Sequence, residues 1–209
     1  MDHDFWLSRW HANQIGFHEA EANARLVAHF DALALGPSGR IFVPLCGKTR
    51  DIAWFLSKGH AVTGVELSAL AIAQLFEDLG AAPTITNAGP MRRYSAANLD
   101  VFVGDLFDLT QDMTGPVDAV YDRGALVALP AAMRTRYAAH VTRITQSAPQ
   151  LVICLEYDQT LMDGPPFSID PHELRRLYGG QYRQTLLGSG RATGRLSHLV
   201  AQESAWLLR

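Results

Sequence analysis

The chain has 209 residues, of which 48% are hydrophobic and 19% are charged, so it can fold as one large domain and is not intrinsically disordered. Eighteen basic and 21 acidic residues leave a net charge of −3, which argues against nucleic acid or an anionic membrane as a partner. No apolar run reaches the roughly 18–20 residues that cross a bilayer, and the N-terminus lacks the apolar segment of a signal peptide, so we expect a cytoplasmic protein.

Two helices are predicted before the first strand, over residues 4–13 and 19–35, from apolar side chains that recur every three or four positions. A Gly-Pro pair ends the second of them. The strands and helices that follow can close into a sheet without this segment. We therefore expect residues 1–35 to form a helical lid over a core made of residues 36–209, within a single domain.

Strands and helices alternate through the rest of the chain. The predicted strands are 40–44, 60–66, 99–103, 117–121, 151–155, 182–187 and 197–207, and the predicted helices are 50–58, 69–79, 131–145 and 171–178. Residues 81–98 are poorly patterned and leave room for another short strand. This alternation favours an α/β fold in which helices cover both faces of a mostly parallel sheet.

The segment Phe42-Val-Pro-Leu-Cys-Gly-Lys48 follows the first strand, at the edge where open parallel sheets bind their ligands. Its end, Gly47-Lys48-Thr49, matches the end of a phosphate-binding P-loop, but Phe42 stands where that motif needs its first glycine. The dinucleotide fingerprint G-x-G-x-x-G is absent as well. Both a P-loop nucleotide site and an NAD site are therefore disfavoured.

A nucleoside cofactor without a pyrophosphate suits this segment better. Gly47 allows close approach of a ligand to the backbone, and Glu66 ends the second strand 19 residues later, where an acid can hold a ribose diol. The competing interpretation of Glu66 is a solvated helix-capping residue. Asp105 follows the next strand and is placed to border an adenine ring. This set points to S-adenosylmethionine.

These motifs resemble those of the thiopurine S-methyltransferase family, in particular its bacterial members. The matching stretches cover about residues 5–178 and are Phe5-Trp6-x-x-x-Trp10, Gln14-Ile-Gly-Phe-His18, Phe42-Val-Pro-Leu-Cys-Gly-Lys48, Gly59-His-x-Val-x-Gly-Val-Glu66-Leu-Ser68, Tyr121-Asp-Arg-Gly-Ala-Leu126, Tyr157-Asp158 and Gly164-Pro-Pro-Phe167. The resemblance implies a class I, Rossmann-like methyltransferase fold. In that fold a mostly parallel, seven-stranded sheet has helices on both faces, and N-terminal helices cover the cofactor.

The resemblance also implies which residues contact the ligands. The cofactor contacts that it implies are Trp10, Leu45, Glu66, Asp105, Leu106 and Arg123, and Gly47 joins them from its place after the first strand. The expected substrate contacts are Phe17, Arg123 and one arginine of the glycine-rich tail, for which Arg191 and Arg195 compete. His18 and Asp158 are further candidates for lining the site.

Several of these side chains have a structural alternative. Trp10 can belong to a core stripe, or its indole face can attract the cationic sulfonium by roughly 0.5–2 kcal/mol. Phe17 can simply pack behind the helix that follows it. Arg123 can form a structural salt bridge, pair with the methionine carboxylate or steady an anionic acceptor.

The predicted activity is S-methylation of a small heteroaromatic thiol by direct in-line displacement. Such a thiol loses its proton easily near neutral pH, so no general base is required and no catalytic residue is assigned. Cys46 lacks the His and acid partners of a nucleophile, and the histidines show no metal-ligand spacing, so we expect no metal. We expect a monomer without nucleic-acid or membrane partners. The alternatives are another soft acceptor (a tellurium or selenium oxyanion, hydrogen sulfide or a halide) and a cofactor-binding protein without turnover.

Overall fold

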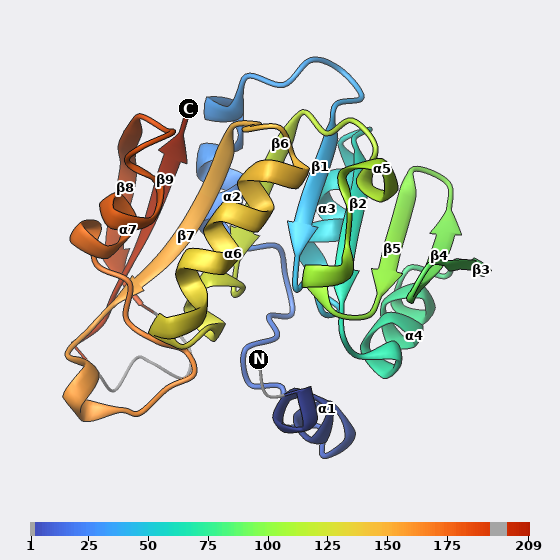
Figure 1. Cartoon of the computed structure of the whole chain (residues 1–209), viewed down its shortest axis with the longest axis horizontal. Coiled ribbons are helices and arrows are strands. Elements are labelled where there is room, and N and C mark those ends of the chain that lie inside the picture. Colours follow the sequence, from blue (N-terminus) through green and yellow to red (C-terminus); the bar gives the residue numbers. More distant parts are fainter. Residues whose placement is uncertain (1–2, 193–199) are drawn as a thin grey trace.

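A computed structural model describes residues 3–192 and 200–209, and its central feature is a nine-stranded sheet (Figure 1). The strands are β1 Arg40–Pro44, β2 Ala61–Glu66, β3 Thr84–Ala88, β4 Met91–Ala96, β5 Leu99–Val103, β6 Ala119–Arg123, β7 Gln150–Glu156, β8 Gln184–Arg191 and β9 Gln202–Leu208. They are ordered β3-β4-β5-β2-β1-β6-β7-β9-β8. The strands from β5 to β7 in this order pair in parallel, and the strands outside them pair antiparallel.

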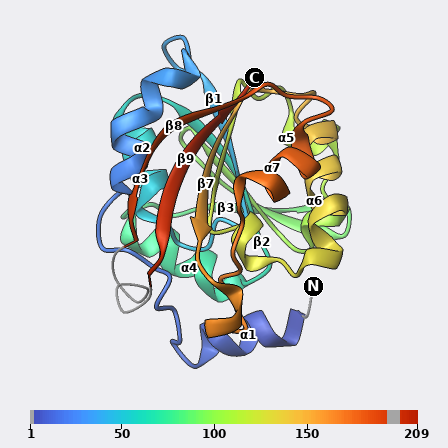
Figure 2. The same ribbon diagram turned by 90° about the vertical axis from the view of Figure 1, so that its left-hand side faces the viewer.

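Helices cover both faces of this sheet, as predicted. The helices are α1 His3–His11, α2 Ala24–His29, α3 Arg50–Ser57, α4 Ala69–Asp78, α5 Gln111–Thr114, α6 Ala131–Ile144 and α7 Pro171–Tyr178, with short 3-10 turns η1 Phe30–Leu33, η2 Leu106–Asp108, η3 Leu126–Ala128 and η4 Gln159–Leu161. Figure 2 shows α2, α3 and α4 on one face and α5, α6 and α7 on the other. α1 stands apart from both layers, beyond the ends toward which β1 and β2 run (Figure 1).

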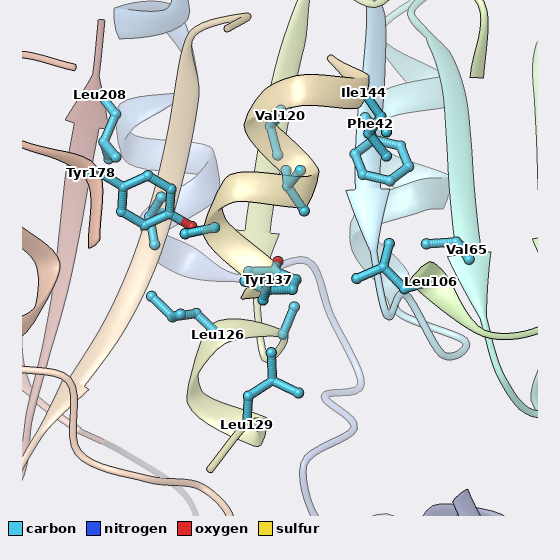
Figure 3. Packing of buried hydrophobic residues seen from close by; sticks show 14 of the residues in the cluster. Phe42, Val65, Leu106, Val120, Leu126, Leu129, Tyr137, Ile144, Tyr178 and Leu208 are labelled. Atoms are coloured by element: carbon cyan, nitrogen blue, oxygen red, sulfur yellow. The ribbon is translucent and has the colours of Figure 1, made fainter. Parts of the chain in front are cut away.

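The central strands form because their side chains are buried on both faces. In β1, Ile41 and Val43 pack into the layer of α2, α3 and α4, while Phe42 packs into the layer of α6 and α7. A strand covered on both sides is apolar at successive positions rather than at alternate ones. Figure 3 shows the second layer, where Tyr137 and Ile144 of α6 lie with Phe42 against the sheet.

The sheet has nine strands rather than the seven expected, because residues 81–98 form the hairpin β3–β4. Gly89, with φ +57°, lies in the turn of this hairpin. All of β3 is exposed except its last residue, which is half-buried, and only Met91 and Tyr94 are buried in β4. A strand without a buried face shows no alternation of apolar and polar residues, so the periodicity could not reveal it.

The predicted helix over 19–35 is wrong in its extent. α2 begins only at Ala24, where the side chain of Asn23 accepts from the backbone N–H groups of Arg25 and Leu26. It continues into η1, after which Ala34 takes a left-handed conformation with φ 52°. Residues 12–22 are therefore irregular chain that connects α1 to the core. In the predicted last strand, residues 197–199 lie outside the described residues, and β9 begins at Gln202.

The helices in the described part of the chain are too short or too polar to cross a membrane.

Candidate functional site

The carboxyl ends of four neighbouring strands carry predicted cofactor positions. The sheet order β5-β2-β1-β6 places these strands side by side, and the chain leaves β1 toward β2 while β6 lies on the opposite side of β1. Open parallel sheets bind their ligands at such a reversal of strand order. Gly47, Glu66, Asp105 and Arg123 each end or follow one of these strands, so the structure brings all four to one edge.

Glu66 is buried at the end of β2, with 6% of its surface exposed. Its Oε2 accepts from the backbone N–H of Gly47 over 2.9 Å, and its Oε1 accepts from that of Ser68 over 2.8 Å. Burial raises the pKa of Glu66, and these two N–H groups partly oppose the shift. The carboxylate therefore ties the loop after β1 to the turn after β2, and Glu66 is not a solvated helix-capping residue. Each oxygen keeps a further lone pair for another donor.

Gly47 lies directly beneath the side chain of Trp10. Its φ of +50° is a conformation that favours glycine, and a Cβ at this position would lie 2.9 Å from Cζ2 of Trp10. The close neighbour of Gly47 in the structure is thus an indole ring. Leu45 also has a positive φ, of 46°, and packs against the buried layer of α6. Cys46 lies between Leu45 and Gly47 in the chain. Burial raises the pKa of its thiol well above the ordinary value, which argues against a nucleophilic role.

Asp105 is the N-cap of the turn η2, just after the end of β5. Its Oδ1 accepts from the backbone N–H of Phe107 over 2.9 Å, and its Oδ2 accepts from Nε2 of His3 over 3.1 Å. His3 belongs to α1, so the N-terminal segment contacts this carboxylate. The next residue, Leu106, is buried.

The carbonyl of Leu106 is held by a residue that the sequence did not single out. His140 of α6 places Nε2 2.9 Å from this oxygen, and its Nδ1 lies 2.9 Å from Nη2 of Arg143. A carbonyl can only accept, so Nε2 carries the proton and Nδ1 accepts from the guanidinium. Burial and the charge of Arg143 lower the pKa of His140, which agrees with a neutral ring. No local motif marks His140, because its partner lies 34 residues away.

The turn after β6 is built on a buried carboxylate. Oδ2 of Asp122 accepts from the hydroxyl of Tyr137 over 2.6 Å, and Oδ1 accepts from the backbone N–H of Leu126 over 3.1 Å. Burial raises the pKa of Asp122, more than these bonds lower it. The next residue, Arg123, places Nη2 2.6 Å from Oε1 of Glu19 in the irregular N-terminal segment. Of these three residues, the sequence predicts a ligand contact only for Arg123.

The aromatic residues of the N-terminal segment form a cluster. Trp10 is buried, with 5% of its surface exposed, whereas Phe17 is 43% exposed. The ring of Phe17 packs edge-on at 5.9 Å from Trp6 and 5.6 Å from Trp10, measured between ring centroids. Phe17 therefore packs on α1, not behind α2. The cluster places α1 over the loop that contains Gly47.

Other predicted site residues lie away from the carboxyl ends of β1, β2, β5 and β6. Arg191 ends the edge strand β8, which β7 and β9 separate from β6. Arg195 lies outside the described residues. Asp158 is exposed and uses Oδ1 to accept from the backbone N–H and hydroxyl of Thr160, which lowers its pKa. Among residues 3–192 and 200–209, no cluster of three or more His, Cys, Asp or Glu side chains is placed to hold a metal ion.

Comparison with known proteins gives a consistent result for sequence and fold. The family model of thiopurine S-methyltransferase matches residues 1–203. The chain is 53% identical to a thiopurine S-methyltransferase of Xanthobacter autotrophicus over 210 residues, covering 100% of this chain and 99% of the relative. It is 45% identical to one of Gluconobacter oxydans over 203 residues, covering 97% and 92%, respectively.

Solved structures of lower sequence identity share the fold. A Burkholderia thailandensis 1,6-didemethyltoxoflavin-N1-methyltransferase, solved with S-adenosylhomocysteine, has a TM-score of 0.66 at 18% identity and covers 99% of this chain and 86% of its own. A magnesium protoporphyrin IX methyltransferase from Synechocystis has a TM-score of 0.64 at 13% identity, with 100% of both chains covered. The predicted class I, Rossmann-like fold is thereby confirmed.

Proposed function

This chain belongs to the thiopurine S-methyltransferase family, and we propose that it transfers a methyl group from S-adenosylmethionine to the sulfur of a small heteroaromatic thiol. The observation that carries the proposal is the similarity to curated relatives over the whole chain, up to 53% identity. The geometry supports it, because two carboxylates and a guanidinium, those of Glu66, Asp105 and Arg123, lie along one edge of the sheet. Alternative soft acceptors and a protein without turnover are not favoured by this membership.

The donor groups at the edge fit an adenosyl ligand that carries an amino acid. Glu66 retains lone pairs for the two ribose hydroxyls, and Asp105 with Leu106 stands at the end of β5 for the adenine. Arg123 provides N–H donors for a carboxylate at the end of β6. We assign the remaining cofactor contacts to Leu45, Gly47 and Trp10, which offer apolar surface and backbone rather than charge. When bound, S-adenosylmethionine supplies a methyl group on a cationic sulfur, which needs no further activation.

The residues of this chain would then align the acceptor and exclude water. We assign residues 1–35 as a lid in which Trp10 covers the loop after β1 and Phe17 faces the acceptor with its exposed edge. Alignment and removal of water suffice for this reaction, because a heteroaromatic thiolate is already a strong nucleophile. Arg123, and either Arg191 or Arg195, would favour the thiolate over the neutral thiol. No side chain is needed as a general base.

We further propose that the enzyme works as a monomer in the cytoplasm. Both cysteines, Cys46 and Cys154, are free and buried, which suits a reducing compartment. Light scattering of the purified protein tests the monomer, with a mass of one 23.0 kDa chain as the expected result.

The activity is tested with methyl-labelled S-adenosylmethionine and a panel of acceptors. The panel contains heteroaromatic thiols, sulfide, iodide, selenite and tellurite. We expect label in the thioethers of the heteroaromatic thiols at the highest kcat/KM. Faster labelling of an inorganic acceptor would overturn the acceptor class, and cofactor binding without any labelled product would overturn the enzyme itself.

A further inference from the structure

Arg123 has a partner that the proposed function does not use. Its Nη2 lies 2.6 Å from Oε1 of Glu19, and the two side chains are 18% and 41% exposed, respectively. The guanidinium is thus largely enclosed at the end of β6, whereas solvent reaches the carboxylate. Glu19 is therefore the member of the pair that a ligand arriving from solvent can replace.

Buried groups hold Glu19 in this position. Nδ2 of Asn23 donates to Oε2 of Glu19 over 3.4 Å, and the backbone N–H of Asn23 donates to Oδ1 of Asp51 over 2.7 Å. Oδ2 of Asp51 accepts from the hydroxyl of Tyr121 over 3.1 Å, and Tyr121 precedes Arg123 by two residues on β6. These contacts form a chain that starts and ends on β6. The fold itself therefore presents the carboxylate of Glu19 to Arg123.

Positive charge gathers around His18, the residue before Glu19. Its pKa is lowered first by burial and then by the charges of Lys48, Arg50 and Arg123, whereas Asp78, the ion-pair partner of Arg50, opposes this shift. Lys48 directly follows Gly47 in the loop after β1, and Arg50 begins α3 at the end of that loop. Removal of the Glu19 charge would leave Arg123 without the carboxylate that contacts it, beside the cation of Lys48, while Arg50 keeps Asp78 as its partner.

We propose that Glu19 is a specificity-determining residue, an internal counter-anion that Arg123 exchanges for the anionic group of a ligand. The proposal rests on the proposed function, which supplies two such groups, the carboxylate of the methyl donor and the thiolate of the acceptor. A guanidinium binds a carboxylate most strongly through two N–H donors, and Glu19 holds one of these nitrogens. Glu19 therefore weakens the binding of anionic ligands and leaves the binding of neutral ones unaffected.

The test compares Glu19→Gln with a matched control, Glu21→Gln, which removes the same charge from an exposed residue two positions away. Calorimetry with S-adenosylhomocysteine and with its decarboxylated analogue measures the effect of the ligand carboxylate. Calorimetry at alkaline pH with a heteroaromatic thiol and with its neutral S-methyl ether measures the effect of the thiolate. Melting temperatures verify that all variants are folded.

Glu19→Gln should lower the Kd of S-adenosylhomocysteine or of the thiolate by about two- to fivefold, the range expected for a half-exposed ion pair. The ligand whose Kd falls identifies the group that replaces Glu19. The decarboxylated analogue and the S-methyl ether should bind as to the wild type, as should every ligand to Glu21→Gln. In an Arg123→Gln background, Glu19→Gln should no longer change either Kd.

The direction of the change in Kd separates this role from a purely structural one. If Glu19 only packs the lid, Glu19→Gln weakens all four ligands together, and this result overturns the proposal, as does no change in any Kd. Glu19→Asp, which keeps the charge, should lie between the wild type and Glu19→Gln. Failure of the proposed function is recognised separately, because the wild type itself would then not bind S-adenosylhomocysteine, and the proposal would fall with it.

Discussion

At the scale of single residues, Glu66 has a structural task beside the one we propose for it in binding. Its two oxygens accept buried N–H groups from Gly47 and Ser68, so they hold two turns of the site together before any ligand arrives. An amide in its place offers only one oxygen. One of the two N–H groups would then face another donor and lose its partner.

We therefore expect Glu66→Gln to lower the free energy of unfolding of the ligand-free protein by about 1–3 kcal/mol, the cost of an unsatisfied buried donor. Urea unfolding measures this loss. Glu77→Gln is the control, because Glu77 is exposed on α4 and should change stability by no more than about 0.5 kcal/mol. Equal stability of the wild type and Glu66→Gln would show that the two N–H groups find other partners.

The difference in unfolding free energy between the wild type and Glu66→Gln should change with pH in a defined direction. Burial raises the pKa of Glu66 above its ordinary value of 4.5, so the folded protein holds this proton more tightly than the unfolded chain does. The contribution of Glu66 to stability is then complete below pH 4.5 and is lost as the pH rises through the folded-state pKa. The stability difference between the wild type and Glu66→Gln should shrink across that window. A difference that grows with pH would contradict the raised pKa.

Gly47 offers a second prediction at this scale, with a control inside the chain. Gly47→Ala meets two costs, a positive φ of 50° and a Cβ placed 2.9 Å from Trp10, whereas Gly80→Ala, at φ +63°, meets nothing within 4 Å. The backbone cost is about 1–2 kcal/mol in each variant. Gly47→Ala should lose more stability than Gly80→Ala in urea unfolding, because Trp10 must also move. Equal losses would show that the indole is not held against the loop.

At the scale of elements, α1 and the irregular chain after it contact three of the predicted cofactor positions. His3 bonds to Asp105, Trp10 covers Gly47 and Glu19 pairs with Arg123. These three positions follow or end different strands, so one N-terminal segment spans the whole edge of the site. α1 also contacts α4, and we propose that this segment opens and closes over the site.

We expect S-adenosylhomocysteine to slow amide hydrogen exchange in α1 more than in the central strands. The central strands are already protected by the sheet, whereas α1 gains its protection from the closed site. Exchange followed by mass spectrometry, with and without the ligand, measures the difference. Equal exchange in α1 under both conditions would mean that the segment is ordinary packing and not a lid.

The helix α6 supports the turn η2 through His140, whose ring bonds to the carbonyl of Leu106. His140→Ala should loosen this turn and raise the KM for S-adenosylmethionine several-fold while kcat changes little. His11→Ala is the control, because His11 is exposed at the end of α1. A fall in kcat at unchanged KM would place His140 in the chemical step instead of in support of the cofactor.

At the scale of the whole molecule, the sequence predicted the central strands to within two residues at either end. Strands that are buried on both faces contain an unbroken apolar run, such as Ile41-Phe42-Val43, and such a run is easily recognised. It failed where burial is one-sided or absent, as in β3, and where a single cap overrides periodicity, as Asn23 does at the start of α2. Tertiary contacts decide such places, and the local pattern does not contain them.

The same limit applies to the site. Gly47, Glu66 and Asp105 could be named because each stands at a fixed place after a strand, and Arg123 because its Asp-Arg-Gly stretch resembles the family's motif. Glu19 could not, because its partner Arg123 lies more than a hundred residues later in the chain and only the fold brings them together. A local motif gives the position of a residue relative to its own strand, but it does not show which side chain from another element will contact it.

The most direct test of this account is a crystal structure of the protein with S-adenosylhomocysteine. We expect the ligand at the carboxyl ends of β1, β2, β5 and β6, with its ribose hydroxyls on Glu66, its adenine beside Asp105 and Leu106, and Trp10 closed over it. A ligand bound at any other edge of the sheet, or bound at this edge without contact to Glu66, would contradict the account.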